Sequence, residues 1–191
     1  MRVRRYLLHL SRASDIARRY FITNGFDGAL TMLGLMAGFS MSEDVALPVA
    51  IKACLGAAVA LGMSGVSSAY LSEAAERKKE LQELEQALLT DLSESDHGKA
   101  SRYLPIVVAL VNGLSPLIIS LIIITPLWLA EQGMDLGIQP FQFAMLVSMS
   151  VIFLLGILLS KLSREFWLWT GLRTLAVAGS TILIIYFFSM N

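Results

Sequence analysis

The sequence predicts an all-α, polytopic membrane protein with five transmembrane helices, and three observations support that fold class. Of its 191 residues 55% are hydrophobic and only 16% are charged, whereas a typical soluble domain has about 25% charged residues. The charges gather in 1–19 and 72–102. Elsewhere apolar runs of about 20 residues recur, which is the length that a helix needs to cross a bilayer. Because the runs are continuous rather than alternating, a β-barrel is disfavoured.

The elements follow from the positions of these runs. Segment 1–19 is predicted to be a cytoplasmic amphipathic helix, because Leu7 and Leu8 can face lipid while the arginines meet head groups. Segment 20–71 holds spans one and two, and segment 104–191 holds spans three to five. The five spans are expected at 20–39, 46–71, 104–129, 141–160 and 166–189.

Segment 72–103 is the sizeable hydrophilic part of the chain. It is rich in Ala, Glu, Leu, Lys and Gln up to Leu92, all of which are good helix formers. We therefore expect span two to continue into the cytoplasm as an acidic helix, followed by a flexible loop over SESDHGKAS. A helical wheel predicts a glutamate stripe beside a leucine stripe: Glu73, Glu76, Glu80 and Glu83, next to Leu81, Leu84, Leu88 and Leu92. Taken alone, such a stripe is typical of an ordinary solvated helix face.

The distribution of lysine and arginine predicts the orientation. Basic residues precede span one, lie between spans two and three, and lie between spans four and five, whereas the connections SMSEDVALP and AEQGMDLGIQP contain none. By the positive-inside rule, the N-terminus is expected in the cytoplasm and the C-terminus outside.

Asp27 is the most informative residue, because it lies inside the first apolar span. A charged side chain at the centre of a membrane helix costs about 2.5–3.5 kcal/mol, so an intramembrane acid marks a functional site by default. The alternative is a neutral carboxyl group hydrogen-bonded between helices. Polar and small residues recur with helical spacing on the same face: Asn24, Asp27, Gly28, Thr31, Gly34, Leu35 and Gly38. Gly34 and Gly38 also form a GxxxG pair, which lets another helix approach closely.

Spans two and three carry further candidate ligands. Met63 and Ser67 lie one turn apart in span two, and Asn112 precedes Pro116 by one turn in span three. Pro116 frees one backbone carbonyl group. Met63 can also be a gap filler, and Asn112 can also join helices. Oxygen ligands with one thioether suit Mn²⁺ and Fe²⁺. The single cysteine, Cys54, and the lack of an intramembrane histidine disfavour a tight zinc site.

Several of these strings together resemble the vacuolar iron transporter family and its small archaeal and bacterial relatives. The strings are FDGALTMLGLMAG, AYLSEAAER and ALVNGLSPLI. The resemblance implies a homodimer in a prokaryotic plasma membrane that exports Fe²⁺ or Mn²⁺ in exchange for protons, with no permanently bound cofactor. It implies that Asp27 is the metal and proton site. It also implies that Glu76 captures metal on the cytoplasmic side, together with the glutamates on the same helix face, Glu73, Glu80 and Glu83.

Two positions depart from the family pattern. The residue before the Y-L-S string is usually glutamate, and here it is Ala69. The residue four positions earlier is usually methionine, and here it is Gly65. Met63 lies two residues earlier still.

The leading functional hypothesis is therefore a proton-coupled carrier of divalent metal ions. The alternatives are a passive cation pathway and a non-transporting membrane adaptor whose charged helix binds a partner protein. An enzyme is not expected, because the sequence contains no nucleophile–base pair and no metal motif such as HExxH. Lipid, metal ions, protons and a second copy of the chain are the expected partners, and nucleic acid is not.

Overall fold

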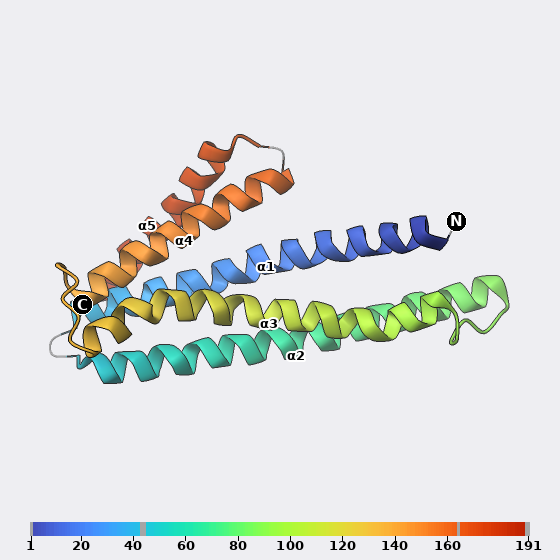
Figure 1. Cartoon of the computed structure of the whole chain (residues 1–191), viewed down its shortest axis with the longest axis horizontal. Coiled ribbons are helices and arrows are strands. Elements are labelled where there is room, and N and C mark those ends of the chain that lie inside the picture. The colour runs from blue at the N-terminus through green and yellow to red at the C-terminus, as the bar shows by residue number, and fades with distance from the viewer. Residues whose placement is uncertain (1, 43–44, 164, 190–191) are drawn as a thin grey trace.

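The structure of the chain is a computed structural model that describes residues 2–42, 45–163 and 165–189, with side chains described for 17–42, 45–161 and 165–189. These residues form five α-helices and no strand (Figure 1), which confirms the all-α class. The helices are α1 Arg2–Met41, α2 Leu47–Leu88, α3 Asp96–Glu131, α4 Pro140–Ser163 and α5 Trp167–Ser189.

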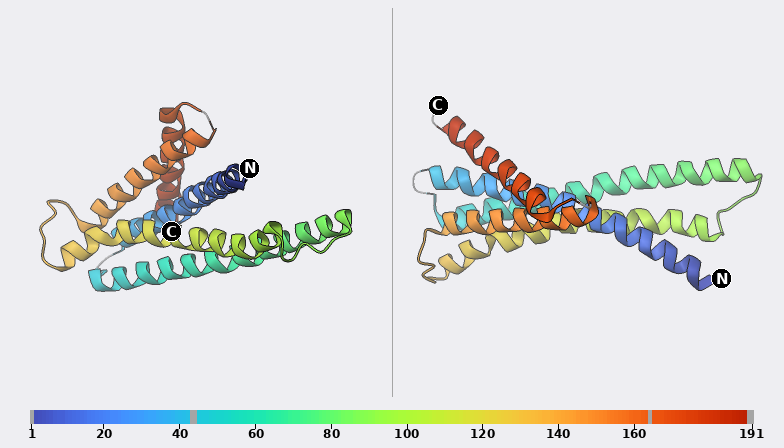
Figure 2. Two further views of the ribbon diagram at one scale, coloured as in Figure 1. Left: turned by 45° about the vertical axis from the view of Figure 1, so that its right-hand side comes forward. Right: turned by 90° about the horizontal axis from the view of Figure 1, so that it is seen from above.

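The helices form two groups. α1, α2 and α3 run side by side along the length of the molecule, while α4 and α5 form a hairpin that tilts away from them (Figures 1 and 2). The most extensive contact is between α2 and α3, and α1 contacts each of the other four helices. α1 therefore makes most of the contact between the two groups, and α3 adds a smaller contact with α4.

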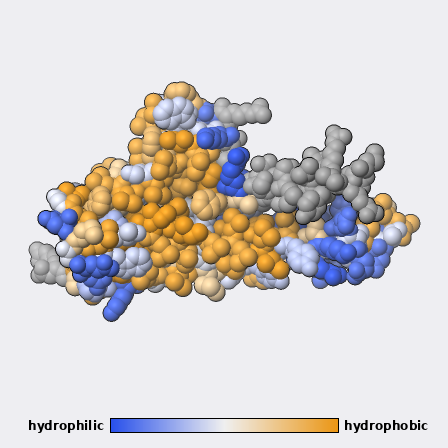
Figure 3. Space-filling model, viewed as in Figure 1, coloured by the Kyte–Doolittle hydropathy of each residue, from blue (hydrophilic) through white to orange (hydrophobic). Residues whose placement is uncertain are grey.

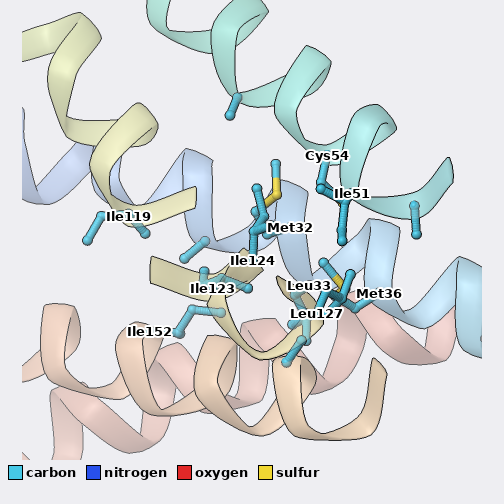
Figure 4. Close-up of a cluster of buried hydrophobic side chains, with 14 of the residues drawn as sticks. Met32, Leu33, Met36, Ile51, Cys54, Ile119, Ile123, Ile124, Leu127 and Ile152 are labelled. Carbon is cyan, nitrogen blue, oxygen red and sulfur yellow. The ribbon is translucent and has the colours of Figure 1, made fainter. Parts of the chain in front are cut away.

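The buried core lies where α1 is enclosed by its neighbours. Met32, Leu33 and Met36 of α1 have no exposed surface. They pack against side chains of α2, α3 and α4 (Figure 4), namely Ile51, Cys54, Ile119, Ile123, Ile124, Leu127 and Ile152. Cys54 is a free, buried cysteine, and it acts here as a small apolar side chain.

Among the described residues, four helices are long and apolar enough to cross a membrane: α2, α3, α4 and α5. In Figure 3, hydrophobic residues cover most of the middle of the visible face, whereas hydrophilic residues gather toward its two ends and in a smaller group beside the α4–α5 hairpin. This distribution is that of an integral membrane protein. α1 is not among these four helices, because polar residues such as Asn24 and Asp27 interrupt its apolar sequence.

The first three helices are longer than a membrane span. At about 1.5 Å per residue, the 42 residues of α2 extend over about 60 Å, roughly twice the hydrocarbon thickness of a bilayer. α2 continues past residue 71 without a break and ends at Leu88, where Leu89 adopts a left-handed conformation with φ of 49°. The predicted extension is helical, although it ends before the predicted Leu92. α1 is likewise continuous through residues 19–20; the predicted lipid-facing side chains of 2–16 lie outside the described residues.

The predicted loop over SESDHGKAS (93–101) is partly wrong, because its residues 96–101 belong to α3. Ser95 is the N-cap of this helix, and its side-chain oxygen accepts a hydrogen bond from the Gly98 backbone N–H at 3.2 Å. Asp96 lies in the first turn, where a negative charge stabilises the positive end of the helix dipole. The cap and the acidic first turn explain why a polar, glycine-containing stretch begins a helix here.

Candidate functional site

A pocket of about 420 Å³, lined largely by residues with polar side chains, lies where α1, α2 and α3 meet. Each helix contributes polar side chains to its wall. The lining residues are Tyr20, Thr23, Asn24 and Asp27 of α1, Ser68, Ala69, Ser72 and Glu73 of α2, and Asn112 of α3. Three of the predicted transport residues, Asn24, Asp27 and Asn112, are therefore brought together, and one predicted capture residue, Glu73, joins them.

A chain of hydrogen bonds connects the three helices at this pocket. The Asn24 side-chain amide donates to the Asn112 side-chain oxygen and to the Tyr20 backbone carbonyl at 2.9 Å. The Asn112 amide in turn donates to the Gly65 carbonyl at 2.9 Å. Asn112 is buried, so its polar groups need these partners. Asn112 therefore joins helices through its hydrogen bonds, and its side chain also lines the pocket.

Glycine permits this close contact between α2 and α3. A Cβ atom added at Gly65 would lie 2.9 Å from the backbone oxygen of Asn112, which is the carbonyl that loses its helical donor at Pro116. A Cβ atom at Gly113 would collide with Val66 and with the backbone oxygen of Gly62. The freed carbonyl predicted from Pro116 thus faces the backbone of α2.

α1 and α3 are in close contact at Gly28. A Cβ atom there would lie 2.8 Å from both the Cα and the carbonyl oxygen of Pro116. The predicted GxxxG pair does not make a comparable approach: Gly34 has only the Ile185 side chain at 3.4 Å, and Gly38 has nothing within 4 Å among the described residues. The close contact of α1 with α3 therefore lies at Gly28, six residues before the start of the predicted GxxxG pair at Gly34.

The two carboxylates of the pocket differ in their surroundings. Asp27 is exposed along the pocket. Glu73 is 6% exposed, and its Oε1 accepts hydrogen bonds from the Arg77 Nε at 3.2 Å and Nη2 at 3.0 Å. A buried carboxylate is costly unless it is paired, and Arg77 is the basic residue that contacts Glu73.

Three predicted transport residues do not line the pocket. Thr31 lies one turn beyond Asp27, and neither Met63 nor Ser67 is part of the wall. Met63 is 61% exposed, and the Ser67 hydroxyl donates to the Met63 backbone carbonyl at 2.8 Å. Met63 is therefore not placed as a thioether ligand for an ion bound beside Asp27.

The remaining glutamates of the predicted stripe are exposed and lie outside the pocket. Glu80 accepts from Arg77 Nη1 at 2.6 Å, and Glu83 lies 3.8 Å from the Lys79 ammonium group. Glu76 is also exposed. The described residues contain no group of three or more His, Cys, Asp or Glu side chains placed to hold one metal ion. Glu80 and Glu83 thus form ion pairs on a solvated helix face.

Four lining residues with polar side chains were absent from the predicted site, namely Tyr20, Thr23, Ser68 and Ser72. A helical wheel contains a signal for the serines, because Ser68 and Ser72 lie one turn apart beside Glu73. Selecting Ser68 rather than Ser67 requires the rotation of α2 about its axis, which one helix alone does not determine.

The hydrogen bond between Asn24 and Asn112 should contribute to the stability of the protein. In a double-mutant cycle with Asn24→Ala and Asn112→Ala, we expect a coupling free energy of about 0.5–2 kcal/mol, the range for interhelical hydrogen bonds in membrane proteins. Unfolding of the purified protein in mixed micelles would measure it. Ser150→Ala is the control, because its hydroxyl bonds only to the carbonyl of Leu146 in its own helix. Additive effects of the two asparagine changes would contradict the network.

The fold and the pocket define an all-helical membrane protein with a polar, carboxylate-containing pocket between three helices. An uncharacterized protein of Methanocaldococcus jannaschii is 28% identical over 171 residues, which cover 88% of this chain and 86% of that protein. No family model matches the chain, and no solved structure matches it. Because the relative is itself uncharacterized, the similarity assigns no activity.

Proposed function

We propose that the chain is a carrier of divalent metal ions, Fe²⁺ or Mn²⁺, that exports them from the cytosol in exchange for protons. The observation that carries this proposal is the pocket between α1, α2 and α3, which combines Asp27 and Glu73 with amide and hydroxyl groups. Oxygen ligands of this kind suit Mn²⁺. A site with two carboxylates and weaker neutral ligands also suits an ion that must be released again.

The departures from the vacuolar iron transporter pattern fit this pocket. Ala69 lines the pocket where that family has glutamate, and Glu73 supplies a carboxylate to the same pocket one turn further along α2. A methionine at position 65 would not fit, because its Cβ atom would lie 2.9 Å from the Asn112 oxygen. The chain therefore has an alternative carboxylate, and the resemblance remains part of our proposal.

The proposed topology has five spans, with α1 crossing the membrane as well. α1 is packed on all four other helices, and the core residues Met32, Leu33 and Met36 are fully buried. The basic segments then lie in the cytoplasm of a prokaryotic cell, together with the acidic part of α2 beyond residue 71, and the C-terminus lies outside. Leu84 and Leu88 are exposed on that part of α2, and we propose that they contribute to a homodimer contact.

One observation favours a second candidate, the membrane adaptor. Glu73 is already paired with Arg77, and Glu80 and Glu83 are paired with basic residues of the same helix. A charged helix with internally paired side chains can serve as a protein-binding surface without binding metal. The adaptor predicts no metal flux, whereas a passive pathway predicts flux that does not depend on a proton gradient.

Flux into proteoliposomes separates these functions. The purified protein would be reconstituted with a metal-sensitive dye inside the vesicles, and Fe²⁺ or Mn²⁺ would be added outside with and without an acidic interior. We expect influx that is faster with the proton gradient, because protons leaving the vesicle drive metal entry. Equal influx with and without the gradient would indicate a passive pathway. No influx of either metal into vesicles containing folded protein would support the adaptor.

A further inference from the structure

We infer that Arg77 is a specificity-determining residue: a tethered cation that competes with the cargo ion for Glu73. This inference rests on the proposed function. Arg77 belongs to the part of α2 beyond residue 71, and its guanidinium group contacts Glu73 at the wall of the pocket. Arg77 itself is not among the lining residues. It therefore acts on the pocket through Glu73.

The geometry lets Arg77 release Glu73 without losing its charge partner. Its Nε and Nη2 atoms both donate to Oε1 of Glu73, at 3.2 Å and 3.0 Å. Its Nη1 atom donates to Oε2 of Glu80 at 2.6 Å. Glu80 is exposed, whereas Glu73 is buried. When a metal ion takes Glu73, the guanidinium group can therefore stay paired with Glu80.

The charges of the pocket then favour a divalent ion. Asp27 and Glu73 are the two carboxylates that line it, and Arg77 neutralises Glu73 in the unloaded state. A divalent ion neutralises both carboxylates while Glu80 neutralises Arg77, so no charge is left unpaired. A monovalent ion brings a single positive charge, the same as Arg77 already supplies to Glu73. To displace Arg77 it must also replace two charge-assisted hydrogen bonds, which are stronger than hydrogen bonds between neutral groups. Arg77 thus excludes monovalent cations at a moderate cost in affinity for divalent ones.

The test is Mn²⁺ binding to the purified full-length protein, measured by electron paramagnetic resonance with and without K⁺. We expect Arg77→Gln to bind Mn²⁺ at least about tenfold more tightly, the factor that corresponds to one charge-assisted hydrogen bond, and to lose Mn²⁺ to added K⁺. Lys79→Gln is the matched control, because it removes one positive charge from the same helix at a residue whose partner, Glu83, is outside the pocket. Its affinity and its K⁺ response should match those of the wild type.

Glu80→Gln provides a second test that leaves the contact between the buried Glu73 and the partly exposed Arg77 intact. Without Glu80, Arg77 keeps its ion pair with Glu73 and only the more distant charge of Glu76 on the same helix, so Mn²⁺ binding should weaken by about two- to fivefold, the range for exposed ion pairs. Glu83→Gln is the control for loss of one negative charge. Equal affinities in Arg77→Gln and Lys79→Gln, or in Glu80→Gln and Glu83→Gln, would overturn the role of Arg77 while leaving the carrier function in place. Absence of Mn²⁺ binding in the wild type and all four variants would overturn both.

Discussion

Asp27→Asn is expected to reduce proton-driven metal flux to the level of protein-free vesicles, a loss on the order of a hundredfold or more, about 2.7 kcal/mol or more in free energy. Asparagine has the size of aspartate, so it still fits the wall of the pocket beside Asn24. It has neither the negative charge that a metal ion requires nor an acid proton to exchange. The expected loss is therefore one of chemistry and not of packing.

The measurement is the initial rate of Mn²⁺ influx with an acidic vesicle interior, for variants with equal amounts of folded protein in the membrane. Asp135→Asn is the matched control, since Asp135 is exposed between α3 and α4 and its Oδ1 accepts the Gly137 N–H at 2.9 Å. Asparagine retains that acceptor, so the flux should stay within about twofold of the wild type, as for most surface substitutions. Wild-type flux in Asp27→Asn would refute the assignment of Asp27 as the metal and proton site.

The fold could be predicted to the extent that it depends on local pattern. Apolar runs and helix-forming residues identified α2, α4 and α5 closely, and the extension of α2 past residue 71 followed from its composition. The start of α3 was missed, because the cap at Ser95 and the acidic first turn outweigh the turn-forming residues around Gly98. The tilt of the α4–α5 hairpin away from α1–α3 (Figure 1) depends on contacts between distant segments, which periodicity does not contain.

The sequence predicted which residues share a face of one helix, but it did not predict which residues of another helix lie opposite them. A wheel of span one places Asn24 and Asp27 on one face, and both line the pocket. It does not specify which residues of α2 face them, and one step of about 100° separates the predicted Ser67 from the observed Ser68. The contact between Glu73 and Arg77 was likewise not predicted, because glutamates at helical spacing look alike until burial distinguishes Glu73 from Glu80.

Gly28→Ala is expected to lower the free energy of unfolding by about 1–3 kcal/mol, the usual cost of overpacking. The added methyl group would lie 2.8 Å from the Cα and the backbone oxygen of Pro116, and neither atom can move without shifting the α3 backbone. α1 and α3 would have to separate, and the neighbouring Asp27 would move with α1. The variant should therefore also bind Mn²⁺ more weakly.

Gly38→Ala is the matched control on the same helix, because nothing among the described residues lies within 4 Å of its added Cβ atom. Alanine is the better helix former by about 1 kcal/mol, so this variant should be as stable as the wild type or more stable. Unfolding of both variants in mixed micelles would measure the difference. Equal stability of Gly28→Ala and Gly38→Ala would show that α1 and α3 do not meet at Gly28 and Pro116. The arrangement of α1, α2 and α3 that forms the pocket would then be wrong.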